Sequence, residues 1–209
     1  MANLLYITCN VAPYQRSRTL SLGQEFLDGY LRFNPDDEVQ VLDLYRDTIQ
    51  RFDLDVLNAR ERMERGEEWV LLSEDERRKM SRVCRLADQL GRCDKYVFVT
   101  HSLNLWFPAE FKIYIDAICA SDRTYRLTPS GVQGMLSDRR RKSLHLHAGP
   151  SGAFAGEEDH SVPYLRSVLS FLGVSEQETV LLAGDDPEKG DQWEYQAARR
   201  TLFKLASRF

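Results

Sequence analysis

The stretch that most constrains the fold is a strand–loop–helix pattern between Lys95 and Asp116. Its apolar run, Tyr96–Val99, is too short for a typical helix and rich in β-branched and aromatic residues, which predicts a buried, parallel strand. Residues 100–107 follow as a loop with unusual apolar and aromatic content, and Pro108 then favours the first turn of a helix. Open α/β sheets present ligands at such junctions, so we interpret the loop as one wall of a cofactor site.

The same alternation of apolar strands and amphipathic helices continues along the chain. Further strands are predicted at residues 3–9, 38–45, 143–147 and 179–183. Further helices are predicted after Ser17, after the capping box that starts at Ser73, at 161–172 and at 187–207. The pattern predicts one α/β domain, 1–209, with a doubly wound sheet of strand order 2-1-3-4-5 and a partly helical insertion at 46–72.

Composition narrows the class of protein. The chain has 209 residues and a formal charge of −4, which argues against nucleic acid or an anionic membrane as the main partner. We interpret the basic clusters at 77–79 and 139–142 as solvated faces. The four cysteines show no CxxC spacing, and no signal peptide or membrane-spanning run occurs, so we expect a cytoplasmic protein.

The first loop, residues 10–19, carries polar side chains at the start of a helix. Ser17 and Thr19, with the helix N–H groups, are suited to hold a phosphate, and Arg16 and Arg18 add positive charge. Capping of the helix by Ser17 explains the same residues without a ligand. The glycine fingerprints of dinucleotide-binding and P-loop proteins are absent from the sequence.

Two more loops are expected at the same edge of the sheet. The apolar side chains of 101–107 suit a flat aromatic ring, with Asn104 as a polar contact; the alternative is that they are core or interface residues. The small residues of 147–152 allow a backbone to approach a ligand closely, although such a turn is common.

Three histidines give a competing hypothesis. His145 and His147 share one face of a strand, and His101 ends its neighbour, so the three could bind a metal. No carboxylate stands at a clear ligand spacing, and packing explains the pair, so we predict no metal. Cys9 as a nucleophile with a histidine base is a further option, but nothing in the sequence locates an oxyanion hole.

Three segments carry a resemblance to a known family. They are Asn-x-x-x-Pro-Ala-x-x-Lys-x-Tyr-x-Asp at 104–116, Thr-Tyr-Arg at 124–126 with later glycines, and Pro-Tyr-Leu at 163–165 with Phe-Leu-Gly at 171–173. In these segments the chain resembles the FMN-dependent NADH:quinone and azo-compound reductases of flavodoxin-like fold. The resemblance implies a homodimer with FMN at each interface. It also implies hydride transfer from NADH or NADPH through the flavin to a quinone, azo or nitro compound.

The cofactor loops depart from the pattern of that family. Residues 101–105 read His-Ser-Leu-Asn-Leu where the family has Pro-Met-Tyr/Trp-Asn-Phe, and 15–17 read Gln-Arg-Ser in place of Ser-x-Ser. At 148–151, Ala-Gly-Pro-Ser replaces a segment with arginine. These departures are compatible with a specialised, biosynthetic substrate. They also leave two alternatives open: non-redox chemistry assisted by histidine or metal after loss of FMN, and a non-catalytic binding or scaffold subunit.

The resemblance and the loops together give a set of expected site residues. The phosphate ligands are expected to be Asn10, Arg16, Ser17 and Thr19. The flavin ring is expected to contact Leu103, Asn104 and Leu105, and its pyrimidine edge His147, Ala148, Gly149, Pro150 and Ser151. The substrate pocket is expected to include Trp106, Phe107 and Tyr125, with His101 or His147 donating a proton or hydrogen bond.

Overall fold

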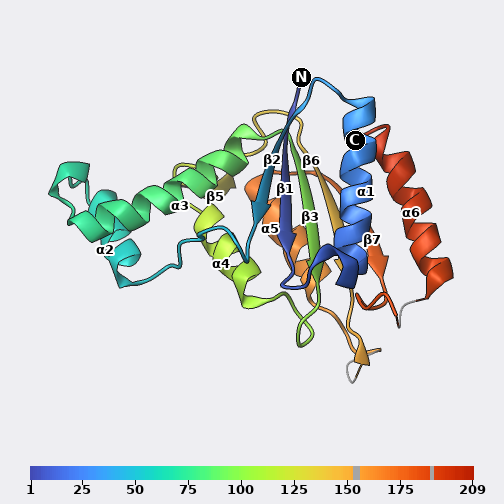
Figure 1. Ribbon diagram of the computed structural model, residues 1–209. Coiled ribbons are helices and arrows are strands. Elements are labelled where there is room, and N and C mark those ends of the chain that lie inside the picture. The colour runs from blue at the N-terminus through green and yellow to red at the C-terminus, as the bar shows by residue number, and fades with distance from the viewer. Residues whose placement is uncertain (153–155, 189–190) are drawn as a thin grey trace.

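Five parallel strands form the centre of a computed structural model that describes residues 1–152, 156–188 and 191–209 (Figure 1). The strands are β1 (Asn3–Cys9), β2 (Glu38–Asp43), β3 (Lys95–His101), β6 (Lys142–Ala148) and β7 (Glu176–Leu182). Their order in the sheet is β2-β1-β3-β6-β7, and every neighbouring pair is parallel. The predicted order 2-1-3-4-5 is therefore confirmed, since β6 and β7 are the fourth and fifth strands of this sheet.

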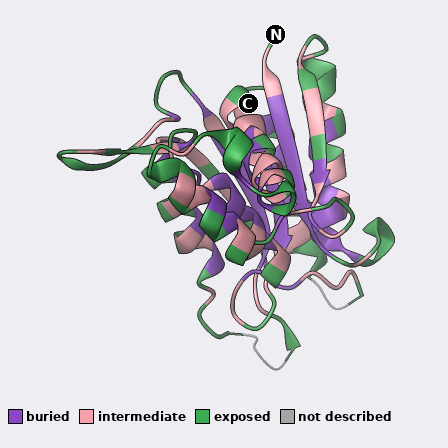
Figure 2. Cartoon of the chain, turned by 90° about the vertical axis from the view of Figure 1, so that its left-hand side faces the viewer, coloured by how far each residue is buried: buried purple, intermediate pink, exposed green. Residues whose placement is uncertain are grey.

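Helices cover both faces of the sheet. One face carries α1 (Arg18–Phe33) and α6 (Gln192–Ala206), and the other carries α3 (Glu74–Arg92), α4 (Ala109–Ile118) and α5 (Ser161–Leu172). Figure 2 shows the strands buried between helices whose outward sides are exposed. A sheet buried on both faces explains why its central strands read as continuous apolar runs rather than as alternating patterns.

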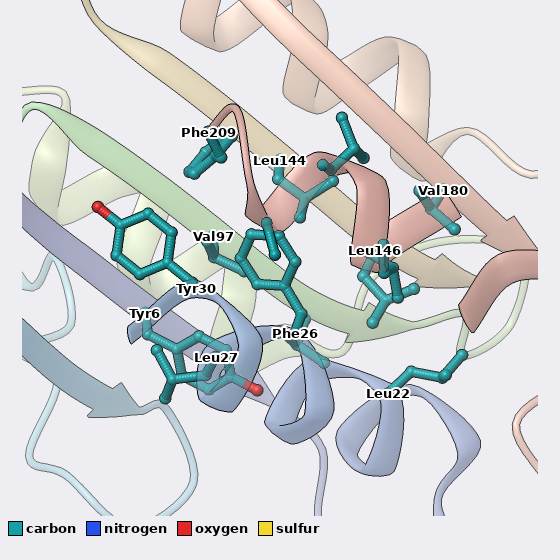
Figure 3. Packing of buried hydrophobic residues seen from close by; sticks show 14 of the residues in the cluster. Tyr6, Leu22, Phe26, Leu27, Tyr30, Val97, Leu144, Leu146, Val180 and Phe209 are labelled. Atoms are coloured by element: carbon teal, nitrogen blue, oxygen red, sulfur yellow. The ribbon is translucent and has the colours of Figure 1, made fainter. Parts of the chain in front are cut away.

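The face under α1 and α6 is packed by large side chains from both layers (Figure 3). Leu22 and Phe26 of α1 lie against the strands, together with Leu144 and Val180. Gly23 allows this close approach, because a Cβ at this position would collide with the Tyr6 hydroxyl.

The face under α3, α4 and α5 is the second part of the core. The apolar side of α4 is buried there, since Phe111, Tyr114, Ile115 and Ile118 are each at most 2% exposed. Pro108 is the N-cap residue of α4, and the Ser73–Glu76 capping box at the start of α3 is present.

The segment 46–72 is partly helical, as predicted. It contains α2 (Leu54–Glu64) and a short 3₁₀ helix, η2 (Trp69–Leu71), and α2 packs against α3. Together with the first half of α3 it projects away from the sheet (Figure 1).

Residues 121–136 lie outside the five-stranded sheet. They form an antiparallel hairpin of β4 (Tyr125–Thr128) and β5 (Gly131–Gly134). The hairpin joins the C-terminal ends of two helices, because the Thr124 hydroxyl donates to the Ile118 carbonyl of α4 and the Leu136 N–H donates to the Leu172 carbonyl of α5.

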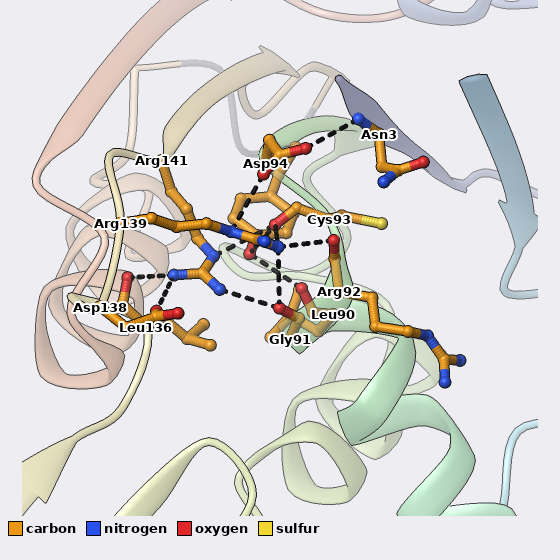
Figure 4. A network of polar contacts seen from close by, with 11 residues as sticks. Asn3, Leu90, Gly91, Arg92, Cys93, Asp94, Leu136, Asp138, Arg139 and Arg141 are labelled. Atoms are coloured by element: carbon orange, nitrogen blue, oxygen red, sulfur yellow. Dashed lines mark hydrogen bonds and ion pairs between the residues drawn. The ribbon is translucent and has the colours of Figure 1, made fainter. Parts of the chain in front are cut away.

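The interpretation of 139–142 as a solvated face is wrong for Arg141. This side chain is 3% exposed and donates to the carbonyls of Gly91, Cys93 and Leu136 (Figure 4). It is therefore a buried cation at the C-terminal end of α3, where the helix leaves carbonyl groups unpaired and the dipole favours positive charge.

Candidate functional site

The loops that follow β1, β3 and β6 meet at the carboxyl edge of the sheet, as predicted, and the loop after β7 joins them there. The Ser102 N–H donates to the Ala148 carbonyl at 2.8 Å and joins the loops after β3 and β6. The Gly149 N–H donates to the Leu182 carbonyl at 2.7 Å. The Arg18 N–H donates to the Asp185 carbonyl at 3.0 Å and so joins the loop after β7 to the start of α1.

The N-terminus of α1 binds an anion supplied by the chain itself. One carboxylate oxygen of Asp185 accepts from the Thr19 N–H and from the Thr19 hydroxyl, both at 2.8 Å. The other oxygen accepts from Asn10 Nδ2 at 2.6 Å. Helix N-termini favour negative charge, because their N–H groups are unpaired and the dipole is positive there. The donor set around Thr19 is thus an anion-binding site.

Ser17 and the two arginines do not lie as expected for phosphate ligands. The Ser17 side chain is buried and accepts from the Leu20 N–H at 3.1 Å, so it caps α1, which was the alternative interpretation. Arg18 is also buried and points to the carbonyls of Gly184 and Asp191. Arg16 ends a 3₁₀ turn, η1 (Tyr14–Arg16), and is exposed; its side chain makes no hydrogen bond or ion pair within the described residues.

The loop after β3 contains a tight two-residue turn. Leu103 and Trp106 pair across it, and its central residues Asn104 and Leu105 have φ angles of 53° and 67°. Positive φ at both central positions is the type I′ pattern, which asparagine tolerates and leucine rarely adopts. Leu103 is 49% exposed, so the turn presents apolar surface at the sheet edge.

The aromatic residues after this turn are divided between surface and core. Trp106 is partly buried and meets the Tyr164 ring edge-on, with 5.1 Å between ring centroids. Phe107 is 5% exposed and stacks on Phe111 at 4.1 Å. Packing against α4 therefore buries the Phe107 ring, and its predicted role in a substrate pocket stays a prediction.

The loop after β6 lies beside the Asp185 loop. Ala148 is buried, whereas Pro150 and Ser151 are more open. A Cβ at Gly184 would lie 3.0 Å from the Cβ of Ser151, so the two loops touch next to Asp185. Ser151 thus lies beside the loop that carries Asp185, and the contact of 147–151 with the pyrimidine edge of a flavin stays a prediction.

His145 and His147 belong to a buried polar chain. The Thr100 hydroxyl lies 2.8 Å from His145 Nε2 and 2.7 Å from His147 Nδ1, and His147 Nε2 lies 2.8 Å from Asp159. Because the carboxylate only accepts, His147 donates from Nε2, and the Thr100 hydroxyl links His147 Nδ1 to His145 Nε2. Within the described residues, His145 Nδ1 has no hydrogen-bond partner. Burial first, and His147 second, lower the pKa of His145 well below its ordinary value, consistent with a neutral ring.

His147 therefore does not serve as a free donor to a ligand. Its side chain is 1% exposed, and both ring nitrogens are occupied by Thr100 and Asp159. Burial opposes ionisation of Asp159, but hydrogen bonds from His147 and from the Ser161 N–H outweigh burial and lower the pKa of this carboxyl.

His101 stands at the end of β3 and is only partly buried. Its Nδ1 lies 3.3 Å from the Cys9 carbonyl, which can only accept, so the ring proton is on Nδ1. Burial lowers the pKa of His101, and the neutral ring keeps Nε2 as an acceptor. Nε2 of neutral His101 can thus accept a hydrogen bond, while donation of a proton or hydrogen bond from His101 to a ligand stays a prediction.

Tyr125 does not lie with the other expected site residues. It begins the hairpin at the ends of α4 and α5, and its ring is 5.6 Å from that of Phe171. The helices of this fold run back from the carboxyl edge, so their C-terminal ends lie at the opposite edge of the sheet. Within one chain, Tyr125 is therefore remote from the loops.

Two residues of the site, Asp159 and Asp185, were missed from the sequence. Asp185 comes three residues after the last residue of β7, and the carboxyl end of that strand lies at the same edge of the sheet, so its position in the sequence could have pointed to the site. Asp159 lies twelve positions after His147, and only the fold reveals that they meet.

Neither a metal centre nor a membrane span is found in the part of the chain that the structure describes. No group of three or more histidine, cysteine or acidic side chains there is arranged to hold a metal ion. Among the same residues, every helix is too short or too polar to cross a membrane.

Comparisons with known proteins agree with this geometry. The family model described as flavodoxin-like fold matches residues 2–205. A relative from Geotalea uraniireducens, named FMN-dependent NADH:quinone oxidoreductase, is 48% identical and covers 100% of both chains. A relative of the same name from Trichlorobacter lovleyi is 47% identical and covers 92% of this chain and 93% of its own.

Solved structures give the same result. An azoreductase from Bacillus anthracis superimposes with a TM-score of 0.87 at 28% identity and covers 100% of both chains. An FMN-dependent NADH-azoreductase of Bacillus anthracis in complex with FMN gives a TM-score of 0.85 at 26% identity, with 100% of this chain and 99% of that chain covered. The chain therefore belongs to the flavodoxin-like family of FMN-dependent NADH:quinone oxidoreductases and azoreductases.

Proposed function

We propose that this protein is an FMN-dependent enzyme that takes hydride from NADH and reduces quinones and azo compounds. The observation that carries the proposal is that the anion-binding N-terminus of α1 and the apolar turn at 103–106 lie at the same edge of the sheet. A ligand with a phosphate at one end and a flat aromatic ring at the other matches this pairing.

The residues at the edge fit FMN. The Asp185 carboxylate already occupies the donor set of Thr19 and Asn10, which supports an anionic group such as phosphate at that position. Arg16 is exposed at the same rim and adds positive charge. The Ser102 hydroxyl is buried without a partner in the described part of the chain and would pair with a polar atom of a ring bound at this turn.

Bound FMN supplies two-electron hydride chemistry, which exchanges reducing equivalents between a nicotinamide and a quinone. The role of the protein residues is to bind FMN and to orient it toward the substrates. Thr19 and Asn10 hold the phosphate, Leu103 and Leu105 support the ring, and the small residues Gly149 and Ser151 allow its polar edge to approach the backbone. His101 accepts a hydrogen bond at Nε2, and Trp106 borders the space left for the second substrate.

We also propose that two copies of the chain form the complete site. Tyr125 lies at the far edge of its own sheet, so it reaches a substrate pocket only when it comes from a partner subunit. The projecting segment offers apolar surface for such contact, because Val70 is 66% and Leu71 is 61% exposed. Sedimentation or light scattering that shows only monomers at micromolar concentration would exclude the shared site.

The test of the function is reconstitution followed by kinetics. Protein incubated with FMN and desalted is expected to keep flavin absorbance at about 370 and 450 nm, a property of any oxidised flavin. NADH oxidation is then expected to depend on added benzoquinone. Parallel lines in double-reciprocal plots would support one site that serves both substrates in turn. Protein that retains no flavin and oxidises no NADH contradicts the proposal.

A matched pair of variants makes the test specific to the site. Thr19→Val removes the hydroxyl that binds the anion and keeps the shape, so we expect FMN affinity to fall about 5- to 30-fold. Thr201→Val in α6 removes an exposed hydroxyl that bonds only the Ala197 carbonyl. It is expected to bind FMN like the natural protein.

A further inference from the structure

The Asp185 carboxylate occupies the donors of Thr19 and Asn10, which the proposed function assigns to the phosphate of FMN. The first-turn N–H groups of α1 are already paired: Arg18 N–H with the Asp185 carbonyl, Thr19 N–H with its carboxylate and Leu20 N–H with Ser17. Asn10 Nδ2 donates both to Ser17 at 3.0 Å and to Asp185 at 2.6 Å. A phosphate therefore finds no unpaired donor at the first turn of α1 until Asp185 turns away.

The backbone of the Asp185 loop is fixed independently of the carboxylate. Arg18 is 3% exposed, and its guanidinium donates to the carbonyls of Gly184 at 3.2 Å and Asp191 at 2.7 Å. It also lies 3.5 Å from Glu194 and stacks over Tyr195. Because Arg18 holds main-chain atoms on both sides of Asp185, rotation of the Asp185 side chain alone is sufficient to empty the anion site.

We propose that Asp185 is an internal competitor of the cofactor phosphate, so that its carboxylate sets how strongly the protein distinguishes FMN from riboflavin. This inference rests on the proposed FMN-dependent function. A carboxylate and a phosphate cannot share the donors of Thr19 and Asn10, since two anions at contact distance repel. The apparent affinity for FMN is reduced by the fraction of molecules in which Asp185 fills the site, whereas riboflavin has no phosphate and does not compete.

The inference is tested by titrating the apoprotein with FMN and with riboflavin, followed by quenching of flavin fluorescence. Asp185→Asn keeps the size of the side chain and removes its charge. We expect its ratio of FMN to riboflavin affinity to rise about 10-fold, the scale of one charge interaction at a helix N-terminus. Asp185→Ala, which removes the competing group altogether, is expected to change the ratio in the same direction.

A second readout separates competition from structural damage. The ligand-free Asp185→Asn protein loses the anion that stabilises α1, so its Tm is expected to fall by about 2–4 °C while its FMN affinity rises. General damage would lower both. Asp186→Asn is the control, because it removes the same charge one position along, where the carboxylate accepts from the Glu188 N–H. It is expected to leave the affinity ratio unchanged.

The possible outcomes separate this inference from the proposed function. If natural protein binds FMN and the two Asp185 variants show an equal or lower FMN-to-riboflavin ratio, Asp185 is not a competitor and the proposed function stands. An equal rise of the FMN-to-riboflavin affinity ratio in Asp186→Asn would also overturn the inference, since the loss of one negative charge anywhere in this loop would then explain the effect. If neither flavin binds to any variant, both the proposed function and this inference are wrong.

Discussion

The imidazole of His147 donates from Nε2 to the carboxylate of Asp159 at 2.8 Å, in a region where both side chains are largely buried. This hydrogen bond joins β6 to the segment that precedes α5. The next residue of that segment, His160, donates its N–H to the Leu105 carbonyl at 3.1 Å. The pair therefore fixes the segment whose backbone holds the turn at 103–106.

Asp159→Asn is expected to lower the free energy of unfolding by about 1.5–3 kcal/mol, the usual size of a hydrogen bond to a charged group. The loss follows because a neutral amide binds His147 less strongly than a carboxylate. Chemical denaturation measures the change. Glu158→Gln removes a neighbouring, exposed carboxylate and is the control. Equal stability of the two variants would show that the His147 contact contributes nothing.

Acid is expected to destabilise the protein through its buried histidines. The pKa values of His145 and His101 are lowered by burial, so the unfolded chain binds their protons more readily than the folded one. Stability from this source is complete above about pH 6.5 and declines as pH falls below that value, by at most about 1.4 kcal/mol per pH unit for each histidine.

Replacement of His145 tests this pH dependence. His145→Gln keeps a donor toward Thr100 and cannot gain a proton, so the slope of unfolding free energy between pH 6.5 and pH 5 is expected to be smaller. His160→Gln replaces an exposed histidine and is the matched control. An unchanged slope in the His145 variant would assign the acid sensitivity to other groups.

Leu105→Gly is expected to stabilise the turn and weaken the site. Leu105 has a φ of 67°, and glycine adopts this conformation without the steric cost of a Cβ. We expect the free energy of unfolding to rise by about 0.5–1 kcal/mol after the entropic cost of glycine. FMN affinity is expected to fall, because an apolar wall is removed. Leu103 has no positive φ, so Leu103→Gly should lower both the free energy of unfolding and the FMN affinity.

Arg141→Gln is expected to destabilise the fold by about 3 kcal/mol, because several carbonyls at the end of α3 lose a charged donor in a buried environment. Arg140 pairs with Glu176 on the surface and differs from Arg141 mainly in its exposure. Arg140→Gln should therefore leave the denaturation midpoint almost unchanged. A similar midpoint shift in both variants would mean that Arg141 is not a structural cation.

The architecture was determined by local patterns in the sequence. Three elements could be predicted from a few neighbouring residues each. They are β3 with its apolar run, α4 with its apolar residues at helical spacing, and α3 with its capping box. Patterns of this kind depend on periodicity and on nearby hydrogen bonds, which do not need the rest of the chain. They were sufficient to predict the strand order and the sheet edge at which the loops after β1, β3 and β6 meet.

The partners of the polar groups were decided only by the tertiary structure. Asn10 and Asp185 are 175 positions apart, and His147 meets a carboxylate that no ligand spacing indicated. Arg141 was predicted to be a surface residue, because the sequence does not show that it contacts the C-terminal end of α3. Hydrogen bonds and ion pairs form only between groups that are close in space. Residues far apart in the sequence become neighbours only when the crossover helices place their strands side by side in the sheet.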